Sequence, residues 1–164
     1  MPFEAQTNLV EVRYQGLSTF VLPVAVAPGI FTLPGGLGAI QHASDYSLVT
    51  ASHPAAPGEA IVIYATGLGS VSTTVADGAP ALGADPVQQV CQPPSVMLGG
   101  TPANGEGASA NILYAGLTPG YVGLYQVNVQ VPPSTPVGPT SLYVFWPGCA
   151  PDTGFGNTVT LPVQ

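Results

Sequence analysis

Apolar and polar residues alternate along several short stretches of the chain, and this alternation is the pattern of a half-buried β-strand. The clearest case is residues 124–131, where Tyr125, Val127, Val129 and Val131 alternate with glutamine and asparagine. Because successive side chains of a strand point to opposite faces, all four apolar side chains share one face. The segment predicts a strand with one face in the core.

Residues 60–66 are apolar at both odd and even positions, which predicts a strand in the interior of a sheet. Shorter alternating stretches predict further strands at 39–43, 46–49, 95–98, 111–115, 142–146 and 158–163. Residues 73–94 are rich in glycine and proline and lack alternation, so we expect a long loop there. Within it, Asp77-Gly78 and Asp85-Pro86 are typical of turns.

The two ends of the chain carry the same strand–turn–strand pattern. Near the N-terminus the alternating apolar residues are Val10, Val12, Tyr14, Phe20, Leu22 and Val24. Near the C-terminus they are Leu142, Val144, Trp146, Val159, Leu161 and Val163, with an insertion between the two arms. Both arms keep their register, which a chance match would not require. We therefore expect the chain to open with a β-hairpin that repeats its closing hairpin.

The predicted N-terminal hairpin needs a packing partner, because isolated two-stranded hairpins are marginally stable in water. Burying its six apolar side chains would contribute roughly 10 kcal/mol before the cost of ordering them. Two alternatives stay open. The hairpin packs on its own chain, or it docks on a neighbouring copy by strand donation and builds a filament.

The composition supports an all-β protein. Glycine (21) and proline (19) recur every few of the 164 residues, so no window of about 12 residues keeps a helical apolar period. Such a composition can indicate disorder, but 46% hydrophobic residues in alternating runs indicate a folded chain. The main elements are therefore expected to be strands.

Charge and the length of the apolar stretches exclude two classes of partner. A single basic residue and a formal net charge of −7 leave nothing to neutralise a phosphate backbone, so we expect no nucleic-acid partner. The longest apolar stretch, residues 20–27, is interrupted by Pro23 and is too short to span a bilayer, so we expect no membrane insertion. Together these features favour an extracellular or cell-surface protein, with any secretion signal upstream or already removed.

Few side chains are available for catalysis or metal binding. The histidines are His42 and His53, and no G-x-S-x-G motif presents a nucleophilic serine. His42 and Asp45 supply two metal ligands, which do not make a site, and His53 stands before Pro54 in a stretch typical of a loop. We therefore expect no enzymatic activity, no metal and no organic cofactor.

Cys91 and Cys149 are the two cysteines of the chain. An even count in a charge-poor, Gly/Pro-rich β protein favours a disulfide. Closing a loop of about 60 residues would contribute about 4 kcal/mol in the chain-entropy model. The bond would tie the 73–94 loop to the turn of the closing hairpin. The alternative is a pair of free buried thiols in a cytosolic protein.

Several motifs resemble the IPT/TIG type of immunoglobulin-like (Ig-like) domain. They are Pro57-Gly58-Glu59 before the 60–66 strand, Gly67-Leu68-Gly69 after it, residues 96–103, residues 125–132, Gly138 and residues 158–163. The resemblance implies an antiparallel Ig-like β-sandwich preceded by a hairpin. Residues 1–35 would be the hairpin, the remnant of a preceding Ig-like unit, and residues 36–164 a complete Ig-like β-sandwich domain.

A closer resemblance covers nearly the whole chain. Residues 27–32, 64–69 and above all 114–132 are similar to a family of uncharacterised C-terminal domains that end large secreted proteins of acidobacteria, especially Solibacter-type soil bacteria. The family has no established activity, so the resemblance implies tandem Ig-like modules outside the cell. This chain departs from the family pattern in insertions around Cys91 and Cys149, and their coincidence supports the pairing of these cysteines.

Two functions compete on these grounds. The first is an extracellular structural or adhesive module that associates with other copies of itself or with neighbouring Ig-like modules. The alternative is a carbohydrate-binding module that stacks polysaccharide on exposed aromatics, for which Tyr121, Trp146 and Phe155 are candidates because they lie near predicted strand ends. Trp146 has a competing interpretation as a core side chain under the Cys149 loop. An exposed row of aromatics would favour sugar binding, and a flat apolar edge would favour self-association.

Overall fold

The computed structural model describes residues 10–21, 27–73, 75–83, 85–86, 94–104, 106–145 and 155–164. It is 51% strand and 2% helix, which confirms the all-β prediction. The helical part is one 3-10 turn, η1 (Pro34–Gly36). Frequent glycine and proline account for this outcome, because neither tolerates a helix interior.

The larger of the two main sheets has six antiparallel strands. Their order is β3 (Gly29–Ile30), β5 (Ala60–Thr66), β10 (Tyr125–Gln130), β9 (Asn111–Leu117) and β6 (Asp85–Pro86), while β4 (Ile40–His42) also pairs with β5. Strand β5 therefore has partners along both sides, β10 on one and β3 and β4 on the other. This position agrees with the interior strand that the apolar residues at both odd and even positions of 60–66 predict.

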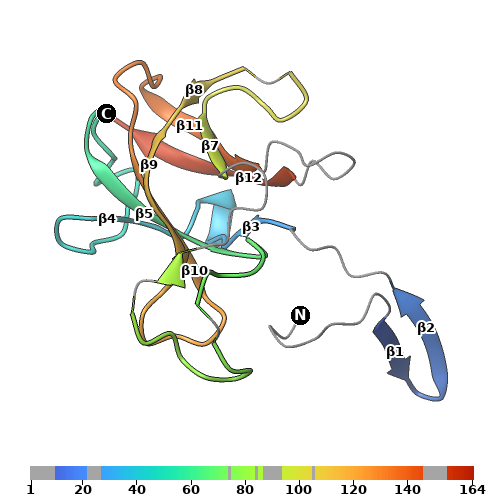
Figure 1. Ribbon diagram of the computed structural model, residues 1–164. Helices are drawn as coiled ribbons and strands as arrows, with labels where there is room; N and C mark the ends of the chain where they lie inside the picture. Colours follow the sequence, from blue (N-terminus) through green and yellow to red (C-terminus); the bar gives the residue numbers. More distant parts are fainter. Residues whose placement is uncertain are drawn as a thin grey trace.

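The smaller sheet packs against the larger one and completes an antiparallel sandwich (Figure 1). Its order is β12 (Phe155–Val163), β11 (Gly138–Phe145), β7 (Ser95–Leu98) and β8 (Ala108–Ser109). Both sheets direct one set of alternating side chains inward, and the fully buried ones include Ile61, Ile63, Val96, Leu98, Val127, Val129, Leu142, Val144 and Leu161. Alternation assigns Val127 and Val129 to the core, whereas Ile61 and Ile63 lie in a stretch that is apolar on both faces.

The N-terminal hairpin forms a two-stranded sheet of its own, β1 (Val10–Tyr14) with β2 (Leu17–Val21). Its two-residue turn has positive φ at both Gln15 (48°) and Gly16 (81°), the geometry that matches the twist of two short strands. Figure 1 shows the hairpin standing apart from the two-sheet body. Strand β2 therefore begins at Leu17, before the 20–24 stretch that the alternation predicts as the second strand of the hairpin. The reason is that the tight turn ends at Gly16.

The chain joins the larger sheet at residue 27. The amide of Ala27 donates to the Gly67 carbonyl over 2.8 Å, and β3 pairs with the end of β5. The part of residues 1–35 that forms the separate hairpin therefore ends before residue 27 in the described chain. The predicted site residues Leu22 and Val24 lie outside the described residues.

One turn prediction is wrong. Asp85-Pro86 forms strand β6 at the edge of the larger sheet, where it pairs with Leu117 and Gly116 of β9. Proline is acceptable there because an edge strand need not donate on its outer side. Alternation cannot reveal a strand of two residues, whose pairing is decided by its neighbour. Asp77-Gly78 is a turn as predicted, and Gly78 has a φ of 77°.

Candidate functional site

The outer face of the larger sheet is set by the alternation of its central strands. In β5, Ile61 and Ile63 point into the core, so Tyr64 belongs to the opposite face. In β10, Val127 is in the core and Gln126 belongs to the opposite face. The register places Gln126 directly across from Tyr64, so a phenol and an amide lie side by side on the outer face.

The strands on the other side of β5 extend this row. The Tyr64 hydroxyl donates to Gln41 Oε1 on β4 over 2.8 Å. Phe31 follows the core residue Ile30, and its backbone amide donates to the Tyr64 carbonyl over 3.0 Å. Its side chain is therefore on the outer face next to Tyr64, and it is 46% exposed. Four strand segments thus contribute polar or aromatic groups to one continuous surface.

Two loops add exposed tyrosines to the same surface. Tyr46 lies just after β4, and Tyr121 lies in the β9–β10 loop beyond the Thr66 end of β5; they are 65% and 59% exposed. Burial raises the pKa of Tyr64, and the neighbouring phenols of Tyr121 and Tyr46 raise it further. The phenols of Tyr46 and Tyr121 therefore each lie near that of Tyr64. We call this surface the aromatic–amide face, and its residues are Phe31, Gln41, Tyr46, Tyr64, Tyr121 and Gln126.

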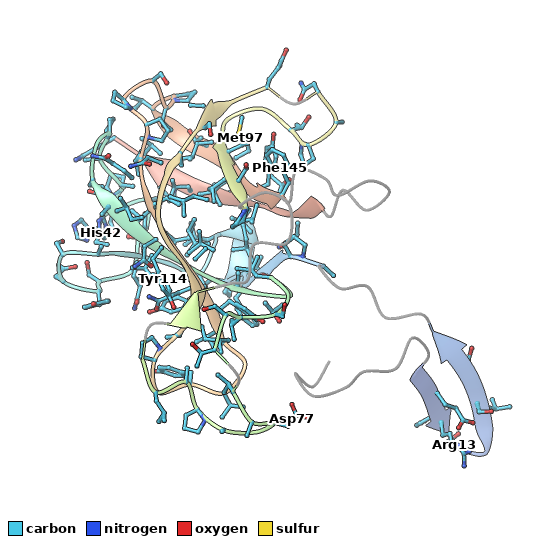
Figure 2. The ribbon with its side chains drawn as sticks, viewed as in Figure 1. Arg13, His42, Asp77, Met97, Tyr114 and Phe145 are labelled. Atoms are coloured by element: carbon cyan, nitrogen blue, oxygen red, sulfur yellow. The ribbon has the colours of Figure 1, made fainter. Side chains whose placement is uncertain are left out.

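A buried acceptor without a partner lies next to this face. Asn128 follows Gln126 on the outer side of β10, between Val62 of β5 and Tyr114 of β9. Its Oδ1 atom is buried and has no hydrogen-bond partner among the described residues. An unsatisfied amide oxygen costs about 1–3 kcal/mol, which is recovered when a donor reaches it. Figure 2 shows Tyr114 on β9, where it borders this region.

Both histidines and a carboxylate gather at the other end of β5. His42 on β4 is buried, with its Nδ1 2.7 Å from Glu59 Oε1 and its Nε2 3.3 Å from the carbonyl oxygen of His53. The two imidazole rings stack with centroids 4.1 Å apart. Every polar atom of the His42 ring therefore has a partner, and the cluster fixes the loop that carries His53 onto β4 (His42 is labelled in Figure 2).

This cluster does not have the geometry of a catalytic triad. The Ser47 hydroxyl donates to Asp45 Oδ1 over 2.7 Å, and the Ser47 amide donates to the same oxygen over 2.9 Å. His53 Nδ1 is 3.3 Å from Ser47 Oγ, but the serine proton is directed at the aspartate instead of the imidazole. A nucleophilic serine needs the opposite arrangement, with an acid orienting the histidine. The contacts are those of a loop stabilised by an Asx turn.

No metal site is found in the described part of the chain, where no group of three or more histidine, cysteine, aspartate or glutamate side chains could hold an ion. Among the same residues, no helix is long and apolar enough to cross a membrane.

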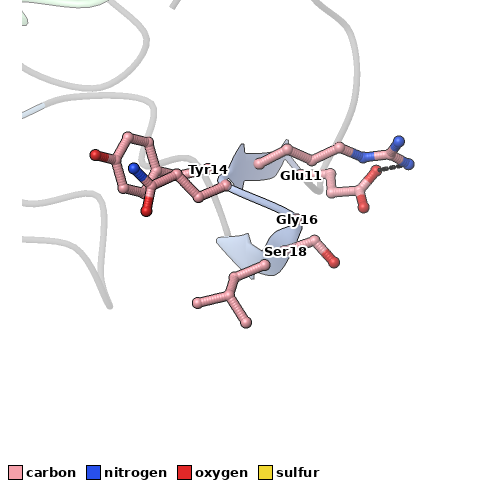
Figure 3. A pocket seen from close by; sticks show the side chains of 7 residues that line it. Glu11, Tyr14, Gly16 and Ser18 are labelled. Carbon is pink, nitrogen blue, oxygen red and sulfur yellow. Dashed lines mark hydrogen bonds and ion pairs between the residues drawn. The ribbon is translucent and has the colours of Figure 1, made fainter.

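The hairpin presents exposed apolar side chains. Tyr14 is 71% exposed and Leu17 is 77% exposed, on either side of the turn. A hollow of about 380 Å³ is lined by the hairpin alone, from Glu11 to Ser18 (Figure 3). Arg13 lies at its rim and donates to Glu11 over 2.8 Å, so the charges on this surface cancel.

The β12 edge of the smaller sheet is already covered. On the outer side of β12, the amide of Gly38 donates to Thr160 and the amide of Ala55 donates to Pro162, over 3.0 and 2.9 Å. A parallel bridge also joins Ala55 to Val163. Covering an edge in this way prevents another chain from adding a strand there. The flat apolar edge that would favour self-association is therefore not found along β12.

The structure describes the side chains of only some of the predicted site residues. Tyr121 lies on the aromatic–amide face, and Tyr14 is exposed on the hairpin. Predicted residues whose side chains lie outside the described part of the chain are Val10, Val12, Phe20, Cys91, Trp146, Cys149 and Phe155. The predicted disulfide therefore stays a prediction.

Sequence reasoning missed Phe31, Tyr46 and Tyr64 as members of a surface. The signal that was available is weak, because residues 60–66 are apolar on both faces and conceal the outward position of Tyr64. Phe31 stands in a turn-rich stretch where alternation gives no direction. Tyr46 begins the predicted 46–49 strand, but the structure has only an isolated bridge at Leu48 there. The strand register was needed to bring these three side chains together.

Comparison with known proteins finds no matching family model, no similar curated protein and no similar solved structure. The resemblance to the acidobacterial domain family stays a prediction. Any function assigned to this chain rests on its own geometry and chemistry.

Proposed function

We propose that this chain is an extracellular structural or adhesive Ig-like module that associates with other copies of itself through its N-terminal hairpin, without catalysis and without a cofactor. One observation carries the proposal. Strands β1 and β2 form a separate two-stranded sheet that exposes Tyr14 and Leu17. Two strands alone are marginally stable in water, so the hairpin gains stability from a partner surface.

The covered edge of β12 supports a partner in another copy. Residues Gly38 and Ala55 occupy the outer side of this long strand, so the hairpin has no open place along it in its own chain. The two outer edges of the hairpin itself have no partner among the described residues. Hairpins of two copies can therefore pair with each other, or a hairpin can lie on the neighbouring sandwich.

The charge distribution supports the hairpin as the contact. Eight acidic residues and one basic residue make whole copies repel each other. The Arg13–Glu11 pair leaves the turn region of the hairpin uncharged overall. Raising the salt concentration screens the general repulsion but changes apolar contacts little. Self-association is therefore expected to strengthen with salt.

The test is the molecular mass in solution of the full chain and of its Leu17→Asp variant, measured by sedimentation over a range of concentrations. We expect the full chain to form dimers or longer assemblies and Leu17→Asp to remain monomeric with an unchanged far-ultraviolet circular dichroism spectrum. Tyr121→Ala serves as the control, because it removes an exposed aromatic elsewhere. A full chain that stays monomeric at every concentration and salt level would overturn the proposal.

A further inference from the structure

We infer that the aromatic–amide face is a second binding surface, independent of self-association, and that it takes a neutral polysaccharide. The inference concerns Phe31, Gln41, Tyr46, Tyr64, Tyr121 and Gln126. It rests on the chemistry that the strand register and two loops bring to one side of the larger sheet.

The aromatic side chains supply stacking surfaces. Phe31, Tyr46 and Tyr121 are 46%, 65% and 59% exposed, although burial is the favoured state of such large rings. The flat face of a pyranose ring carries C–H groups and stacks on an aromatic ring of this kind. Phenylalanine and tyrosine lose few rotamers on binding, so the entropic cost of such a contact is low.

The amides supply hydrogen bonds that match sugar hydroxyls. A hydroxyl both donates and accepts, and a carboxamide offers both a donor and an acceptor. Gln126 is next to Tyr64, whose hydroxyl already positions Gln41. Gln126 therefore places an amide donor and acceptor directly beside Tyr64.

The lack of charge on the face selects a neutral ligand. The six residues of the face are all uncharged at neutral pH, and both neighbours that perturb the pKa of Tyr64 electrostatically are tyrosines. The chain's basic side chain, Arg13, lies on the hairpin and is paired with Glu11. A polyanion would find no cation here and would be repelled by the net charge of −7.

The shape of the face selects an extended chain. Its residues come from adjacent strands β4, β5 and β10, whose spacing of about 4.8 Å makes the row roughly 10 Å wide before the loops are added. The aromatic residues at its ends, Tyr46 and Tyr121, lie beyond opposite ends of β5. A surface of this extent contacts several units of a polymer along its length.

The test is binding of the full chain to insoluble cellulose, chitin and mannan, measured by depletion from solution, with polygalacturonate as an anionic comparison in affinity electrophoresis. We expect the protein to bind at least one neutral polymer and to show no retardation by polygalacturonate. Tyr121→Ala and Gln126→Ala should each weaken that binding at least tenfold. Tyr14→Ala is the matched control, because it removes an exposed tyrosine from the hairpin, outside the face.

The inference is overturned if none of the three neutral polymers retains the protein, or if Tyr14→Ala weakens binding as much as Tyr121→Ala. It is also overturned if Tyr121→Ala leaves polymer binding intact but abolishes self-association, because the face would then be a protein interface. Leu17→Asp separates this inference from the proposed self-association. A monomeric Leu17→Asp variant that still binds the polymer supports the face and leaves the hairpin proposal to its own test.

Discussion

The side chain of Asn157 forms two hydrogen bonds with the backbone of Ile30. Asn157 Oδ1 accepts from the Ile30 amide over 2.7 Å, and its Nδ2 donates to the Ile30 carbonyl over 3.0 Å. Asn157 is on β12 of the smaller sheet, and Ile30 is on β3 of the larger sheet. One amide therefore imitates a strand partner and joins the two sheets where the chain enters the sandwich.

Replacing Asn157 with alanine should destabilise the protein by about 1–2 kcal/mol, because two backbone groups of Ile30 lose their partner. Thr158→Ala is the control, since Thr158 is exposed and should change stability by less than about 0.5 kcal/mol. Urea denaturation of both variants measures the difference. Equal stability of the two variants would show that water replaces the amide without cost.

The close approach of Ala27 to the end of β5 depends on Gly67. It has a φ of 72°, and a Cβ atom added there would lie 1.9 Å from the carbonyl oxygen of Ala27. Gly67→Ala should therefore cost about 3 kcal/mol or more. At Gly58, φ is 87° and nothing lies within 4 Å of the added atom, so Gly58→Ala should cost about 1 kcal/mol. Thermal unfolding of the pair separates steric conflict from backbone conformation alone.

Stability should fall in alkaline solution, and Tyr125 contributes to the fall. Its hydroxyl donates to the Gly69 carbonyl, and burial raises its pKa to about 12. In the unfolded chain a tyrosine ionises near pH 10, so the unfolded state releases this proton first. The stabilisation is complete below about pH 10 and is lost as the pH rises towards 12.

Tyr125→Phe removes this ionisation. The variant should lose less stability than the native chain between about pH 10 and 12, even if it is less stable at neutral pH by the one hydrogen bond. Urea denaturation at pH 8, 10 and 11.5 measures both effects. Parallel curves for the two proteins would contradict the role given to Tyr125. Burial also raises the pKa of Tyr143, so part of the alkaline loss remains in the variant.

The two histidines should differ in their effect on stability. His42 is buried between Glu59 and the His53 loop, so His42→Ala leaves a cavity and an unpaired carboxylate and should cost about 2–3 kcal/mol. His53 is exposed, and His53→Ala should cost less than about 1 kcal/mol. Thermal unfolding compares them. A loss of hydrolytic activity in His53→Ala would contradict the non-catalytic interpretation of this cluster.

The predicted Cys91–Cys149 disulfide can be tested by mass. The intact protein treated with an alkylating reagent without reductant should gain no mass, and after reduction it should gain the mass of two labels. Reduction should lower the melting temperature because the bond restricts the unfolded chain by about 4 kcal/mol. The fold should persist, since the core is built from both sheets independently of these residues. Two labels without reductant would show free thiols.

The sequence determined the strands of the core. Residues 60–66 and 95–98 are the strands β5 and β7 to the residue, and 124–131 contains β10. Alternation is sufficient for 95–98 and 124–131 because each of these strands has one face against the opposite sheet, and the burial of that face imposes a period of two. Residues 60–66 are predicted instead by an apolar run that ends at Gly67. The all-β class followed from the same positions and from glycine and proline that interrupt helices.

The tertiary structure decided which surfaces these strands create. Phe31, Tyr64 and Gln126 are far apart in the sequence and meet because β3 and β10 both pair with β5 in a particular register. A shift of one residue would turn every one of these side chains to the other face. Likewise, the ring stacking of His42 and His53 depends on how one loop folds back. Local patterns specify which residues are buried, but neighbours on the surface are fixed by strand pairing across long sequence distances.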